Sequence, residues 1–124
     1  MRATLFALGL IALPALAAAA ETDVRVTLDI PGDAQIETHR YKCEGRDAPL
    51  VARYINAEPN YLALLAPDPD GRQMIFSNVI AASGARYAAG QYVWWTKGAD
   101  ATLQNITDGP DAKPIACREI NDTP

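Results

Sequence analysis

The sequence predicts an all-β domain, either an antiparallel sandwich or a small barrel. Short apolar segments are separated by turn signals about every 8–12 residues, which is typical of both architectures. Beyond the first twenty residues, no segment has the spacing of a long amphipathic helix. The alanine-rich stretch 81–89 contains Gly84 and ends at Gly90, so it is not expected to be helical either. The 124 residues are enough for one such domain and too few for two.

The expected strands follow from hydrophobic alternation and from the turns between them. Val24, Val26, Leu28 and Ile30 occupy every second position, which predicts a half-buried first strand. The segment 67–71, with two prolines, two aspartates and a glycine, is the strongest turn signal in the chain. The remaining strands are expected at residues 36–43, 50–57, 61–66, 73–80, 86–88, 91–97, 101–106 and 115–120.

The first twenty residues are expected to be a secretory signal peptide. Arg2 precedes an almost entirely apolar run, and the small residues 17–20 lie before an expected cut near Ala20. The run contains Pro14 and is shorter than the roughly 20 residues that a membrane span needs. No cysteine lies at the cut to carry a lipid. We therefore expect residues 21–124 to form a single exported domain that has no membrane anchor and is not a lipoprotein.

The charge of this domain disfavours some partners. Without Arg2, the 11 lysines and arginines become 10 against 15 acidic residues, a net charge of −5. An acidic surface makes nucleic acid an unsuitable partner, because binding it depends on neutralising phosphates. Encounter with a basic protein is favoured instead, chiefly through the association rate.

The two cysteines, Cys43 and Cys117, both lie in the part expected to be exported. In an oxidising compartment the simplest interpretation is one disulfide. Closing a loop of about 75 residues would stabilise the fold by roughly 4 kcal/mol by the chain-entropy argument. A metal site is the alternative, but His39 is the only histidine, so we expect neither a metal nor a cofactor.

Ser83 and Lys97 are the residues that could carry chemistry, because each lies beside a glycine that marks a turn. They could form a Ser-Lys nucleophilic dyad, but the chain has neither a G-x-S-x-G elbow nor S-x-x-K spacing. Trp94 and Trp95 face opposite sides of one expected strand, so one is expected in the core. The other could cover the surface or contact a partner, and a carbohydrate-binding module using Trp94 or Trp95 is an alternative function.

A longer pattern surrounds these residues. The chain reads Ser83-Gly84-Ala85-Arg86-Tyr87 and then Tyr92-Val93-Trp94-Trp95-Thr96-Lys97-Gly98, after an earlier Tyr41-Lys42-Cys43. The paired SGxxY and TKG elements and the Y-x-C start resemble the bacterial membrane-bound and periplasmic inhibitors of c-type lysozyme. The resemblance extends from about Tyr41 to Cys117, which falls where the partner cysteine of that family is expected.

This resemblance implies an eight-stranded antiparallel barrel and a non-enzymatic function, with a c-type lysozyme as the protein partner. It further implies that Ser83 and Lys97 enter the lysozyme cleft and thereby protect peptidoglycan. The wider target-binding set is expected to comprise Ser83, Gly84, Arg86, Tyr87, Thr96, Lys97 and Gly98. Within the motif, Tyr87 and Tyr92 are expected to hold the loops more than to touch the enzyme. The membrane-bound branch of the family carries a lipidated cysteine after its signal peptide. This chain has no such cysteine, so it resembles the soluble periplasmic branch.

Overall fold

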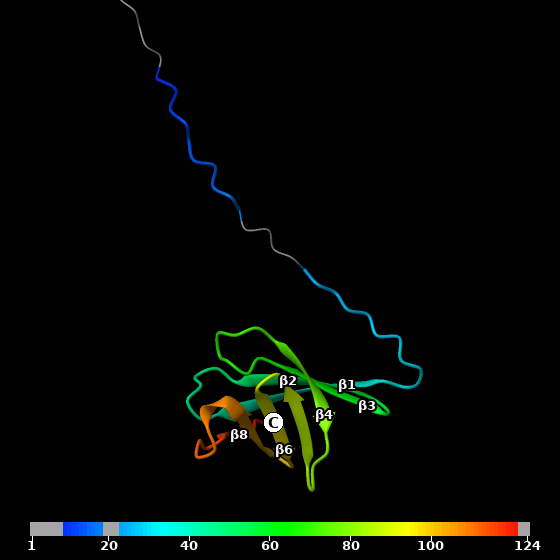
Figure 1. The fold of residues 1–124 in the computed structure, drawn as a ribbon. Helices are drawn as coiled ribbons and strands as arrows, with labels where there is room; N and C mark the ends of the chain where they lie inside the picture. Colours follow the sequence, from blue (N-terminus) through cyan, green and yellow to red (C-terminus); the bar gives the residue numbers. More distant parts are fainter. Residues whose placement is uncertain (1–8, 19–22, 122–124) are drawn as a thin grey trace, which may run out of the picture.

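The computed structural model describes residues 9–18 and 23–121 and consists of one closed β-barrel with an extended N-terminal segment (Figure 1). The strands are β1 (Gln35–Cys43), β2 (Leu50–Ala57), β3 (Asn60–Leu65), β4 (Met74–Val79), β5 (Ala85–Ala89), β6 (Tyr92–Lys97), β7 (Asp100–Asn105) and β8 (Ile115–Glu119). A short 3₁₀ helix, Ile106–Asp108, follows β7. Each strand pairs antiparallel with the next, and β8 pairs with β1. The expected all-β class and eight-stranded barrel are confirmed.

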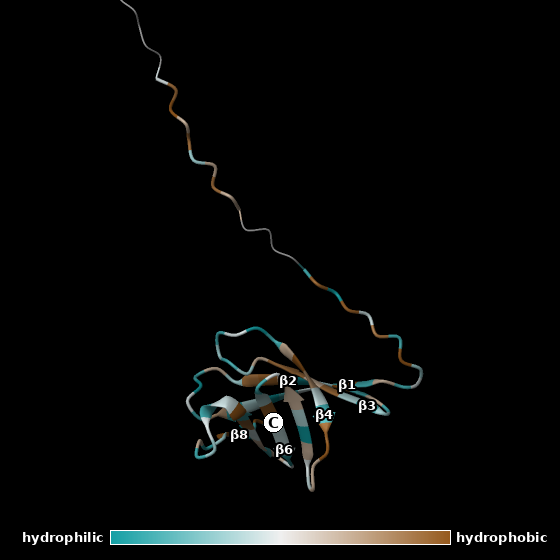
Figure 2. Cartoon of the chain, viewed as in Figure 1, coloured by the Kyte–Doolittle hydropathy of each residue, from teal (hydrophilic) through white to brown (hydrophobic). Residues whose placement is uncertain are grey.

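The predicted first strand is wrong. Val24, Val26 and Leu28 are 76%, 67% and 57% exposed, and residues 23–30 form no strand. Figure 2 shows apolar and polar residues alternating along this segment outside the barrel. The alternation does favour a strand, but the barrel closes through the pairing of β1 with β2 and with β8, so it is complete without this segment.

The expected signal peptide is only partly visible. Residues 9–18 are exposed and form no regular secondary structure, and the expected cut near Ala20 lies outside the described residues. In the described part of the chain, no helix is long and apolar enough to cross a membrane.

The barrel interior is filled by residues that face inward at alternate strand positions. Its largest fully buried side chains are Trp94, Phe76, Leu50 and Leu65. Small residues on neighbouring strands, Ala52 and Ala63, are also fully buried and leave space for the large rings. Trp94 is therefore the core tryptophan, and a sugar-binding role for Trp94 is excluded by its burial.

A series of hydrogen-bonded side chains crosses this core. The indole nitrogen of Trp94 donates a hydrogen bond to the Tyr54 hydroxyl at 2.9 Å, and the Tyr54 and Tyr41 hydroxyls lie 3.0 Å apart. Burial raises the pKa of Tyr54 well above its usual value, so the phenol stays protonated. The hydrogen bonds offset the cost of taking these polar groups out of water.

Cys43 and Cys117 form the expected disulfide. The two residues lie directly opposite each other in the β1–β8 ladder, and both are buried. The covalent bond therefore joins the first and last strands at the seam where the barrel closes.

Candidate functional site

The two motif elements lie side by side at one end of the barrel. The β4–β5 loop, residues 80–84, carries Ser83, and a two-residue turn after Lys97 connects β6 to β7. Because β5 pairs with β6, Ala85 at the start of β5 lies opposite Thr96 near the end of β6. The loop and the turn are therefore neighbours, and Ser83 and Lys97 are both exposed there.

Gly84 allows the two segments to approach each other closely. Its φ of +66° lies in the left-handed region that favours glycine. A Cβ atom at this position would overlap the Thr96 carbonyl oxygen and would lie 2.8 Å from Lys97 Cγ. The backbone of the serine loop thus packs directly on the Thr96–Lys97 segment, with no space for a side chain between them.

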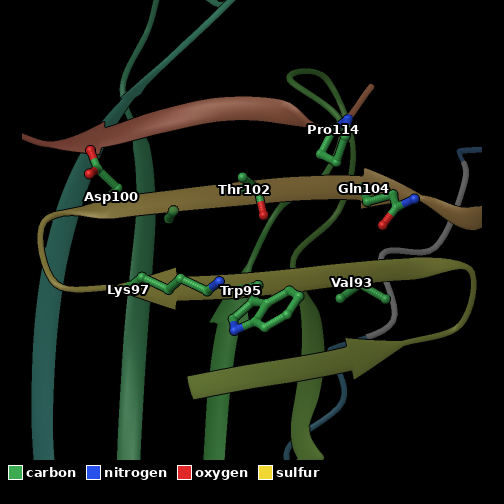
Figure 3. Close-up of a pocket in the computed structure, with 8 residues that line it drawn as sticks. Val93, Trp95, Lys97, Asp100, Thr102, Gln104 and Pro114 are labelled. Carbon is green, nitrogen blue, oxygen red and sulfur yellow. The ribbon is translucent and has the colours of Figure 1, made fainter. Parts of the chain in front are cut away.

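Trp95 lies on the outer face of β6 and contacts both elements. Its indole nitrogen donates a 2.8 Å hydrogen bond to the Ser83 carbonyl oxygen. The Lys97 ammonium lies 4.2 Å from the centroid of the Trp95 ring, and the Arg86 guanidinium lies 5.6 Å from it. Figure 3 shows the Lys97 side chain running along the strand toward Trp95. The ring also borders a hollow of about 280 Å³ that reaches Thr102 and Gln104 on β7.

The other expected target-binding residues have different surroundings. Tyr87 is only 5% exposed and belongs to the barrel core, and its support of the loops stays a prediction. Thr96 is half-buried and donates from its hydroxyl to the Ala85 carbonyl oxygen at 3.4 Å. Gly98 has a φ of +60° and open space around it, so glycine is favoured there because it allows the backbone conformation of the turn. Any contact of these residues with a target stays a prediction.

Tyr92 contacts a different loop, at the opposite end of the barrel from Ser83 and Lys97. Its hydroxyl donates a 2.9 Å hydrogen bond to Asp68, which lies in the loop between β3 and β4. Within the described residues, no group of three or more histidine, cysteine, aspartate or glutamate side chains is arranged to hold a metal ion.

The barrel mouth beside this site contains a charged cluster that the sequence did not predict. His39 Nδ1 lies 2.6 Å from a Glu119 carboxylate oxygen, and His39 Nε2 lies 3.3 Å from Glu37. These three side chains border a pocket of about 220 Å³ that also touches Thr96 and Gly98. His39 and Glu119 are 80 residues apart, so no local sequence signal could have paired them.

The carboxylates raise the pKa of His39. The hydrogen bond to Glu119 is the largest cause, burial opposes it, and Glu37 adds to the increase. Because the pKa in the folded state is above the unfolded value, the cluster stabilises the fold fully below about pH 6.5. This stabilisation is lost as the pH rises through the pKa of the folded protein.

We therefore expect the unfolding temperature of the parent protein to fall relative to that of His39→Gln as the pH rises from about 6 to 9. Calorimetry on both proteins measures the difference. His39 is the only histidine, so one imidazole NMR resonance reports its pKa directly. A pKa at or below that of a model peptide would contradict this prediction.

Chemically, the site presents an alcohol and an ammonium on adjoining loops. A nucleophilic dyad requires a desolvated lysine, whereas Lys97 is exposed and its ammonium lies over an aromatic ring. The arrangement is instead suited to binding a surface that offers one protonated carboxyl group and one ionised carboxylate.

Comparison with known proteins gives a consistent result. Residues 41–112 match the family described as membrane-bound lysozyme-inhibitor of c-type lysozyme. A protein of Pseudomonas aeruginosa named membrane-bound lysozyme inhibitor of C-type lysozyme is 48% identical over 96 residues, which cover 74% of this chain and 73% of that protein. A protein of the same name from Cupriavidus necator is 40% identical over 75 residues, covering 60% of this chain and 58% of that protein.

A solved structure is similar as well. It is the crystal structure of Pseudomonas aeruginosa MliC in complex with hen egg white lysozyme. The match has a TM-score of 0.61 and 44% sequence identity, and it covers 81% of this chain and all of that one.

Proposed function

Because the chain belongs to the family of membrane-bound lysozyme inhibitors of c-type lysozyme, we propose that it inhibits such an enzyme by inserting Ser83 and Lys97 into the active-site cleft. The family consists of inhibitors of an enzyme and not of enzymes. The observation that carries the proposal is the close approach at Gly84, which makes the Ser83 loop and Lys97 parts of one protrusion.

The chemistry of the two side chains matches that of the cleft. The active site of lysozyme contains one carboxyl group that is protonated near neutral pH and one that is ionised. A serine hydroxyl can accept a hydrogen bond from the first and donate one to the second. Lys97 would supply the positive charge that the ionised group requires once the loops displace water.

The charge of the domain supports fast association. With a net charge of −5 for residues 21–124, the inhibitor would attract a basic enzyme over a distance of about a Debye length. Arg86 is half-buried beside Trp95, so we assign it a position at the rim of the contact.

The cell envelope is the location that fits this function. The two relatives are named as membrane-bound. For this chain we propose export by residues 1–20, cleavage near Ala20, and a periplasmic domain of residues 21–124. The lack of a cysteine at the cut is our reason for proposing a soluble form that is not a lipoprotein.

The alternative of a carbohydrate-binding module is weaker. It now depends on Trp95, since Trp94 is fully buried, and the Lys97 ammonium already lies over the Trp95 ring where a sugar would stack. Binding of soluble peptidoglycan fragments, with no effect on lysozyme, would favour this alternative.

The proposal is tested by titrating residues 21–124 into a cell-lysis assay with an animal c-type lysozyme, with g-type and i-type enzymes in parallel. We expect stoichiometric loss of c-type activity and little effect on the other two. Unchanged c-type activity at excess inhibitor would rule out the proposed function.

In the same assay, Ser83→Ala is expected to weaken inhibition by about 1–3 kcal/mol, because the enzyme's carboxyl groups lose their hydrogen-bond partner. Ser77→Ala is a matched control, since Ser77 is exposed on β4 outside the site. Equal inhibition by both variants and the parent would mean that the Ser83 hydroxyl makes no contact in the cleft.

A further inference from the structure

Trp95 contacts both the loop that carries Ser83 and the side chain of Lys97. Its N–H group is hydrogen-bonded to the backbone of Ser83 at 2.8 Å, and its ring lies 4.2 Å from the Lys97 ammonium. A single indole therefore contacts the loop that carries the hydroxyl and the side chain that carries the charge.

We propose that Trp95 is a positioning residue that holds Ser83 and Lys97 in one arrangement before a target binds. This inference rests on the proposed function and adds a residue that acts through the other two. A tryptophan suits the task because its ring attracts a cation while its N–H group donates a hydrogen bond.

Both groups require such support. Lysine has a flexible four-carbon stem, and ordering that stem on binding would reduce affinity. Ser83 lies in a loop whose residues 82–84 are all exposed, so the barrel core does not hold the loop. The Trp95 contacts restrict the lysine and the loop in the free protein, which leaves less ordering to be done when the target binds.

The position of Trp95 on the barrel makes this restriction effective. Trp95 pairs with Arg86 on β5 and with Thr102 on β7, so its backbone is held on both sides by the sheet. Figure 3 shows the ring lying along β6 between Val93 and Lys97. The indole is thus anchored on the sheet, where the Ser83 backbone and the Lys97 ammonium contact it.

Two variants separate the contacts. Trp95→Phe keeps an aromatic ring near Lys97 but removes the hydrogen bond to Ser83, and we expect inhibition to weaken about threefold to tenfold. Trp95→Leu removes both contacts, and we expect a loss of about tenfold to a hundredfold. Gln104→Ala is the control, because Gln104 borders the same hollow from β7, where it pairs with Val93.

To test for a purely structural role of Trp95, the loss of inhibition caused by Trp95→Leu is measured in the parent and again in a Lys97→Ala background. If Trp95 acts through both Ser83 and Lys97, Trp95→Leu should weaken inhibition there only by the threefold to tenfold expected for the lost Ser83 hydrogen bond, which is less than in the parent background. An equal loss in both backgrounds, or full inhibition by Trp95→Leu, would overturn the inference.

NMR of the inhibitor alone provides a readout that needs no lysozyme. The Lys97 methylene protons should be shifted upfield by the indole ring current in the parent and should return to ordinary values in Trp95→Leu. Unshifted Lys97 signals in the parent would contradict the positioning role. Shifted signals in a parent that inhibits no c-type lysozyme would support the Trp95 contact and refute the proposed function.

Discussion

Lys97→Ala is expected to weaken inhibition of c-type lysozyme by about 2–5 kcal/mol, which corresponds to roughly 30-fold to 4,000-fold in the inhibition constant. The substitution removes the cation while the ionised carboxylate of the enzyme stays covered by the inhibitor. A buried carboxylate without a partner is costly, and most of the expected loss comes from this cost.

The loss should appear mainly as faster dissociation, because Lys97 is expected to act inside the contact and not at its rim. Surface plasmon resonance on the parent and the variant measures both rates. Lys113→Ala is the matched control, since Lys113 is an exposed lysine in the β7–β8 connection. Equal dissociation rates for parent, variant and control would place Lys97 outside the contact.

Gly84→Ala is expected to destabilise the fold by about 2–5 kcal/mol and to weaken inhibition at least tenfold. A left-handed conformation costs a non-glycine residue about 1–2 kcal/mol, and forcing an atom into a packed site adds about 1–3 kcal/mol. At Gly84 the added methyl group would overlap the Thr96 carbonyl oxygen, so the serine loop must move away from Lys97.

Gly45→Ala separates the two contributions. Gly45 has a φ of +74°, but a Cβ atom there would have no neighbour within 4 Å, and its turn is at the other end of the barrel. We expect Gly45→Ala to be destabilised only by the cost of the left-handed backbone, about 1–2 kcal/mol, and to inhibit lysozyme as the parent does. Denaturant unfolding and the lysis assay measure both effects, and equal losses for the two variants would show that the close approach at Gly84 has no role.

The strands of the barrel were predictable because each is short, apolar at alternate positions and followed by a turn residue. Leu50–Ala57 is an example in which the expected and observed bounds agree. Val24–Ile30 has the same pattern and no strand, since pattern alone does not reveal whether a pairing partner exists. That information comes from barrel closure, which is a property of the whole chain.

The site was predictable in part. The glycines beside Ser83 and Lys97 indicated turns, and the family resemblance singled out both side chains. The double contact of Trp95 could not be predicted, because alternation leaves open which of two adjacent tryptophans faces outward. The pairing of His39 with Glu119 likewise depends on β8 returning to β1.

The central claim is that Lys97 meets the ionised catalytic carboxylate of the enzyme. The most direct test is a double-mutant cycle between Lys97→Ala and a lysozyme in which that carboxylate is replaced by its amide. We expect Lys97→Ala to cost about 2–5 kcal/mol against the parent enzyme and less than about 0.5 kcal/mol against the amide variant. The same cost against both enzymes would contradict the account.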